Sequence, residues 1–121
     1  MKVCDAIQRV RELKPNQYDD ETLVRWLSDL DGQIWQDALC NYQDAPPAPE
    51  PYTTNSMDQQ LLADHPHEEM YITYLSARID LQNGEYERYN NTMMMYNMQL
   101  QNFYNAFNRK HRPKADVFIG F

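Results

Sequence analysis

Histidine and glutamate side chains, which are common metal ligands, gather at one place in the sequence, residues 65–69, with the order HPHEE. In the HExxH zinc motif, two histidines four positions apart share one helix face, with a glutamate between them. Here His65 and His67 lie two positions apart, so a helix would not place them on one face. We favour polar side chains solvated at the start of a helix, and predict no metal site and no other cofactor.

Other side chains capable of catalysis lack the partners that catalysis requires. The acidic pairs Asp19-Asp20 and Asp29-Asp31 are explained as helix caps and solvated faces, without general acid or base chemistry. None of the three serines follows the pattern that exposes a nucleophilic serine. The sequence therefore predicts no catalytic residues and a protein that is not an enzyme.

The two cysteines, Cys4 and Cys40, are far apart and lack CxxC spacing. We expect buried, reduced thiols in preference to a disulfide or a metal site.

Apolar residues recur with the spacing of one helix face in four stretches. These are residues 3–13, 20–42, 65–82 and 85–109. The third stretch is apolar on two sides, which predicts a central helix. We therefore expect an all-α fold, a small helical bundle of about four helices.

A proline-rich segment separates the second and third predicted helices. Residues 43–64 contain four prolines between positions 46 and 51, which excludes a continuous helix. We expect a long loop that projects from the bundle and is either mobile or ordered by a partner. Its apolar residues are interface candidates: Tyr52, Met57, Leu61 and Leu62.

The fourth predicted helix has apolar residues spaced alternately three and four apart from Tyr86 to Phe107. This a/d repeat favours an antiparallel hairpin with the third helix, and an intermolecular coiled coil is the alternative. Further large side chains widen the stripe beyond what one neighbour covers, which predicts contact with another subunit. They are Met94, Met95, Met98 and Tyr104.

The end of the chain combines a basic run at 109–114 with an apolar sequence, VFIGF, at 117–121. We divide the chain into a helical domain at 1–112 and an extended C-terminal tail at 113–121. Large apolar side chains such as Phe118 and Phe121 need a binding surface, so they are interface candidates too. Two alternatives remain open, the chain's own bundle and an adjacent subunit.

The formal net charge of −7 argues against binding the phosphates of nucleic acid or the surface of an anionic membrane. No stretch approaches the ~20 apolar residues that span a bilayer, and the first residues lack the core of a signal peptide. We therefore expect a protein that stays in the cytoplasm where it is made, without sequence-specific nucleic-acid binding and without a membrane partner.

Three stretches of sequence resemble a known family: ELKPNQYDDETLVRWLSDLDG at 12–32, EPYTTNSMDQQLL at 50–62 and IDLQNGEYERYNN at 79–91. They are similar to head-to-tail connector, or adaptor, proteins of tailed phages and prophages that infect Firmicutes. The resemblance implies a structural virion protein that is assembled in the host cytoplasm. It also implies a ring-forming homo-oligomer that binds portal and tail-completion proteins. Residues 115–121 depart from the family pattern, which usually ends soon after the proline corresponding to Pro113.

Two other classes of protein fit the same helical periodicity. A non-viral helical interaction or regulatory module would form dimers instead of large rings. A small helical enzyme would need a pocket with converging titratable groups.

Overall fold

The computed structural model describes residues 1–114, and it has an all-α fold, a small bundle of four helices. The elements are α1 (Val3–Leu13), α2 (Asp20–Asp37), the short 3₁₀ helix η1 (Leu39–Asn41), α3 (Glu69–Gln82) and α4 (Tyr86–Lys110). The predicted fold class is therefore confirmed. The predicted C-terminal tail lies outside the described residues from position 115 onward.

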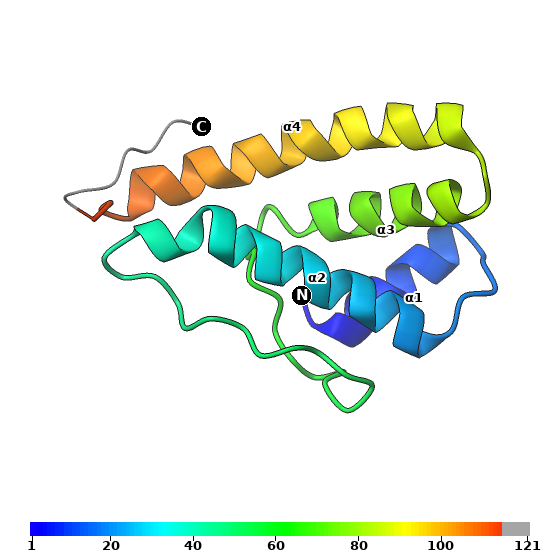
Figure 1. The fold of residues 1–121 in the computed structure, drawn as a ribbon, viewed down its shortest axis with the longest axis horizontal. Helices are drawn as coiled ribbons and strands as arrows, with labels where there is room; N and C mark the ends of the chain where they lie inside the picture. Colours follow the sequence, from blue (N-terminus) through cyan, green and yellow to red (C-terminus); the bar gives the residue numbers. More distant parts are fainter. Residues whose placement is uncertain (115–121) are drawn as a thin grey trace.

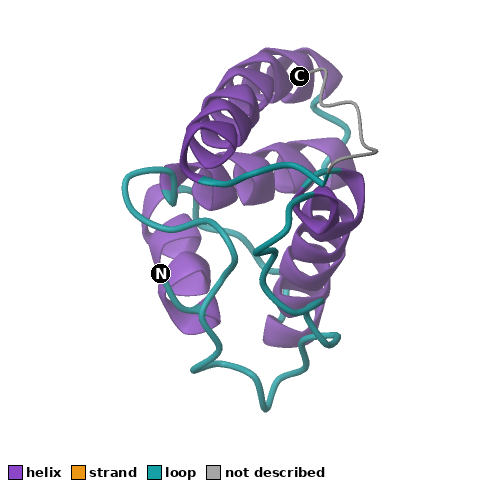
Figure 2. Ribbon diagram, turned by 90° about the vertical axis from the view of Figure 1, so that its left-hand side faces the viewer, coloured by secondary structure: helices purple, strands orange, loops and turns teal. Residues whose placement is uncertain are grey.

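Helix α3 is the centre of the bundle, because it contacts α1, α2 and α4 (Figure 1). Among the residues described, α4 packs onto the bundle through α3 and makes no close backbone contact with α1 or α2. This arrangement confirms the prediction of a central third helix. It leaves α4 as the outermost layer (Figures 1 and 2).

The turn between α3 and α4 is set by one glycine. Gly84 has a φ of +77°, a left-handed conformation that favours glycine. The amide of Glu85 donates to the carbonyl of Asp80, and the amide of Gly84 donates to that of Leu81. These two bonds form a Schellman motif, which ends α3 and turns the chain back along it.

Helix α2 begins as predicted and ends earlier than predicted. The side chain of Asp19 accepts a hydrogen bond from the amide of Thr22, an N-cap. The helix was expected to continue to residue 42, but it ends at Asp37 and tightens into η1. This tighter turn brings both Leu39 and Tyr42, three residues apart, into the interior.

The connection between η1 and α3 packs along the start of α1, on the side of the bundle away from α4 (Figures 1 and 2). The first amides of a helix have no partner within that helix. The amide of Val3 donates to the carbonyl of Gln59, and that of Cys4 donates to the carbonyl of Met57. The connection therefore caps α1. It continues to Glu68, so α3 begins four residues after the predicted start at His65.

Residues from all four helices form one buried cluster. Trp26, Leu27 and Leu30 of α2 belong to it together with Leu75 of α3 and Tyr96 of α4. The apolar stripes of these helices therefore share one core.

Candidate functional site

The outer side of α4 exposes three methionines. Met94 and Met98 are each 69% exposed and Met95 is 56% exposed, whereas Tyr96 and Phe103 on the opposite side are buried. We call Met94, Met95 and Met98 the methionine face. Because positions four apart lie above one another on a helix, Met94 and Met98 form one row along α4.

The helix around the methionine face is also free of charge. No Asp, Glu, Lys or Arg occurs between residues 89 and 108. The exposed polar residues beside the methionines are amides: Asn90, Asn91, Asn97, Asn102 and Asn105. The cores of protein interfaces are depleted of charged residues and enriched in methionine, so α4 has the composition of an interface.

The three methionines were predicted from the sequence as interface candidates, and the amides beside them were not. The sequence does contain a signal for this surface, the absence of charged residues between positions 89 and 108. An uncharged run of this length is unusual on the exposed side of a helix in a chain of net charge −7.

The structure contradicts the expectation that the apolar residues of the connection are offered to a partner. Tyr52 is 8% exposed and Leu61 is 5% exposed, and both belong to the chain's own core. Met57 and Leu62 are half-buried against the same core. At these four residues the connection is therefore packed on its own domain.

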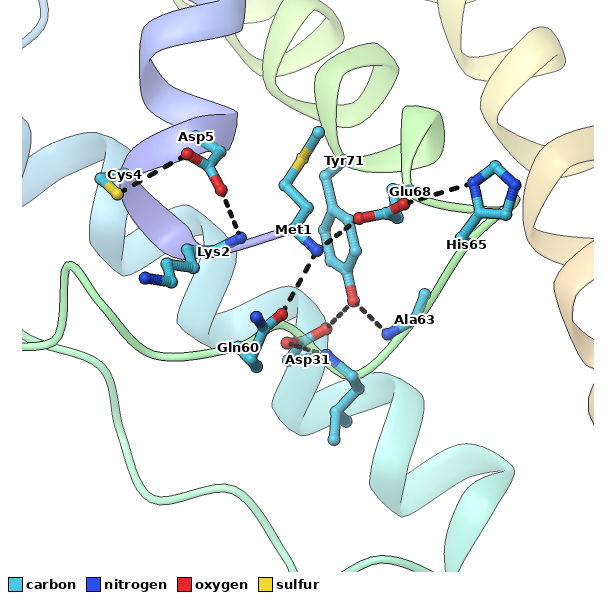
Figure 3. Close-up of polar contacts among 11 residues, drawn as sticks. Met1, Lys2, Cys4, Asp5, Asp31, Gln60, Ala63, His65, Glu68 and Tyr71 are labelled. Carbon is cyan, nitrogen blue, oxygen red and sulfur yellow. Dashed lines mark hydrogen bonds and ion pairs between the residues drawn. The ribbon is translucent and has the colours of Figure 1, made fainter.

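A buried carboxylate, Asp31, holds the connection against α2. Its side chain is fully buried and accepts hydrogen bonds from the hydroxyls of Tyr52 and Tyr71, each at 2.7 Å. It also accepts one from the amide of Leu62 at 3.0 Å. Figure 3 shows the Tyr71 hydroxyl between Asp31 and the amide of Ala63, which donates to it at 2.8 Å.

Burial shifts the acidities of these groups. Desolvation raises the pKa of Asp31, although the hydrogen bonds from Tyr71, Tyr52 and Leu62 lower it in part. Desolvation and the neighbouring Asp31 carboxylate raise the pKa of both Tyr52 and Tyr71. A buried cluster with every donor paired is suited to fixing a loop, and it offers a substrate no access. The prediction that Asp31 lies on a solvated face was wrong.

The N-terminus is tied to the same connection. The ammonium of Met1 forms an ion pair with Glu68 and donates to the side-chain oxygen of Gln60 at 3.3 Å (Figure 3). Lys2 forms an isolated antiparallel bridge with Gln60. These contacts, like the hydrogen bonds of Asp31, hold the connection in place.

The histidines of the HPHEE run do not converge. His65 is exposed and lies 3.8 Å from Glu68, whereas the ring of His67 packs against Phe103. No group of three potential metal ligands occurs within the described part of the chain. Cys4 and Cys40 are free and half-buried, not fully buried as expected.

The remaining interface candidates divide into two groups. Tyr104 is half-buried against the core, where burial raises the pKa of its hydroxyl to about 12. Phe118 and Phe121 lie outside the described residues. The methionine face is thus the part of the predicted interface that the structure places on the surface.

Neither a known protein family, nor a curated protein, nor a solved structure matches this chain. None of the helices at positions 1–114 combines the length and the apolar character required to span a bilayer.

Proposed function

We propose that this chain is a subunit of a homo-oligomeric assembly, and that the methionine face of α4 forms part of the contact between copies. The observation that carries the proposal is the exposure of Met94, Met95 and Met98 on a helix side without charge. Flexible methionine side chains adapt to the surface that they meet.

Charge favours this side of the molecule for contact between identical chains. Each copy has a formal charge of −7, so two copies repel each other wherever their acidic surfaces approach. Repulsion is least where the surface is neutral, as it is along α4. Added salt is expected to leave the assembly unchanged or to strengthen it, because salt screens the repulsion between like-charged copies.

Other surfaces must contribute to a stable contact. A helix of 25 residues is about 37 Å long and about 10 Å wide, so one side presents roughly 400 Å². A stable interface buries about 800 Å² of each partner. The methionine face is therefore the centre of a larger contact.

We further propose that the assembly is a phage head-to-tail connector, a ring located between the portal and the tail of a virion. The support is the similarity of residues 12–32, 50–62 and 79–91 to that family. In this role the chain binds other proteins and has no catalytic activity. An acidic ring also suits a channel through which DNA moves without binding.

Sedimentation velocity and negative-stain imaging of the full chain test this proposal. A connector subunit forms closed rings of many copies, alone or with a portal protein. A chain that forms only dimers contradicts the connector assignment and favours a non-viral interaction module. A chain that stays monomeric at every concentration and also fails to join a portal ring contradicts the assembly role itself.

A further inference from the structure

A groove of about 330 Å³ lies between α2 and α4, with α3 at its floor. It exists because α2 and α4 make no close backbone contact with each other in the described structure. Leu30 and Ile34 line it on α2. Four tyrosines line the floor and the opposite side: Tyr74, Tyr89, Tyr96 and Tyr104. Grooves lined by aromatic side chains bind proline-rich segments in the polyproline II conformation.

The groove has a cationic end and an anionic end. Arg78 of α3 lines it, and its guanidinium lies 5.2 Å from the centroid of the Trp26 ring in α2. Asp37 lines it about three helical turns after Trp26, where α2 ends. Arg78 has no ion pair with another described residue, and its Nε has no hydrogen-bond partner there. A carboxylate that enters the groove beside Arg78 would therefore gain a charge-assisted hydrogen bond.

A proline-rich segment lies on the surface at residues 45–51. Each proline fixes its own φ and restricts the residue before it to extended backbone, which gives the polyproline II conformation. Burial follows the three-residue period of that conformation, since Pro46 and Pro49 are half-buried. The indole of Trp35 donates to the carbonyl of Pro46 at 2.7 Å. The outer edges of the segment are exposed: Pro47, Ala48, Glu50 and Pro51.

The segment and the groove lie on different sides of α2. The segment runs along the side of α2 away from α4, and the groove lies between the two helices (Figure 1). A contact between the segment and a groove therefore joins two copies of the chain. Such a contact uses different surfaces of the two copies, and it builds a closed ring or an open filament.

Length and charge agree with one orientation of the segment in the groove. Residues 47–51 extend over about 12 Å as polyproline II, and α2 rises about 10 Å from Leu30 to Asp37. Glu50 is the one charged residue of the segment. With Glu50 beside Arg78 of the receiving copy, Pro47 lies towards the end marked by Asp37. The acidic side chain thus meets the cation and stays away from the anion.

We propose that residues 47–51 of one copy bind in the α2–α4 groove of the next copy, with Glu50 paired to Arg78 and the prolines against the tyrosine rings. This inference rests on the proposed function, because it requires assembly of identical chains. It also supplies contact area that the methionine face lacks. Asn97 lines the groove and precedes Met98 on α4, so the groove and the methionine face adjoin.

Two variants of exposed carboxylates in the connection test the segment. Glu50→Lys and Asp58→Lys each change the net charge from −7 to −5, so each relieves the repulsion between copies equally. The Asp58 side chain is 93% exposed and lies outside the proline-rich segment. By light scattering of the full chain over a dilution series, we expect Glu50→Lys to weaken association by about 30-fold or more. Asp58→Lys should associate at least as tightly as the parent.

The outcomes separate this inference from the proposed function. A parent chain that assembles, together with equal association of Glu50→Lys and Asp58→Lys, would overturn the inference and leave the proposed function standing. A parent chain that stays monomeric would overturn both.

A second pair of variants tests the groove without touching α4. Gln33 and Gln36 are both exposed on α2, and of the two only Gln33 lines the groove. We expect Gln33→Trp to fill the groove and prevent assembly, and Gln36→Trp to assemble as the parent does. Loss of assembly in Gln33→Trp but not in Glu50→Lys would mean that another part of the neighbouring copy occupies the groove, which contradicts the proposal.

Mixing the two defective chains gives the decisive result. Gln33→Trp keeps its segment and Glu50→Lys keeps its groove, so one intact contact can form between them. We expect a complex with the mass of two chains and nothing larger, and its formation also shows that both variants are folded. A mixture that contains only single chains would overturn the proposal.

Discussion

At the scale of single residues, Asp31 is the polar group on which the position of the connection depends. Replacing it with alanine leaves the hydroxyls of Tyr52 and Tyr71 and the amide of Leu62 without their acceptor. We expect Asp31→Ala to lower the free energy of unfolding by about 3–5 kcal/mol, because buried donors lose their partner together. Urea unfolding measures this loss. A change below about 1 kcal/mol would show that the two hydroxyls and the amide do not depend on Asp31 as their hydrogen-bond acceptor.

Asp31→Asn separates hydrogen bonding from charge. The amide that replaces the Asp31 carboxylate can accept a hydrogen bond with its oxygen and donate one with its nitrogen. With the nitrogen facing Tyr71, the Tyr71 hydroxyl still contacts the side chain but loses the acceptor for its own proton. We expect a smaller loss than for Asp31→Ala, about 1–3 kcal/mol. A loss as large as that of the alanine variant would mean that the charge, not the shape of the group, holds the cluster.

The raised pKa of Asp31 predicts a pH dependence with a definite sign. Between the ordinary value of 3.8 and the higher pKa in the folded state, the folded chain binds the proton more tightly than the unfolded chain. The contribution of Asp31 to the free energy of unfolding therefore falls as the pH rises through this window. The difference in the free energy of unfolding between the parent and Asp31→Asn should decrease as the pH rises through this window, and should be constant above it. A difference that increases with pH there would contradict a raised pKa.

A second buried carboxylate links the C-terminal end of α1 to α3. Asp80 is fully buried and forms an ion pair with the ammonium of Lys14. Lys14→Met leaves that carboxylate without its counter-charge, so we expect a loss of about 3–5 kcal/mol. The double variant Lys14→Met with Asp80→Leu should recover part of this stability. A double variant that is less stable than Lys14→Met alone would show that the broken ion pair is not the reason for the loss of stability.

At the scale of elements, the connection between η1 and α3 depends on contacts distant in sequence. Tyr52→Phe removes the hydroxyl that donates to Asp31 and keeps the ring. We expect faster amide exchange and faster proteolysis at residues 50–61, by a factor of about ten, which corresponds to about 1.4 kcal/mol of local stability. Tyr86→Phe is the matched control, because Tyr86 is 64% exposed. Equal effects of the two variants would show that the Tyr52 hydroxyl does not anchor the segment.

Local patterns in the sequence were sufficient to predict the helices and not their connection. The bounds of α1 follow from its amphipathic spacing, and the a/d repeat of α4 identified its buried side. The start of α3 and the packing of the connection depend on the amides of Val3 and Cys4 and on Asp31, whose partners lie far away in the sequence. Asp31 did carry a signal, since it lies four residues after Leu27 and three before Ile34, on the buried side of α2.

At the scale of the whole molecule, the four helices form a core on which one outer helix presents a neutral, methionine-rich side. The methionines contribute little to the fold because they are exposed, so their replacement should change assembly and spare stability. The interface candidates in the connection could not be separated from core residues by sequence alone, since both groups are apolar. Burial within the domain separates them.

The measurement that tests the central claim most directly is the mass of the assembly in solution by light scattering, for Met94→Lys and Leu13→Lys. Both variants place a lysine at an exposed apolar position, 69% exposed for Met94 and 62% for Leu13, but only Met94 belongs to the methionine face. We predict that Met94→Lys lowers the mass towards that of one chain, while Leu13→Lys keeps the parent's mass and both keep the parent's melting temperature. An unchanged mass for Met94→Lys, or an equal fall for both variants, would contradict assembly through α4.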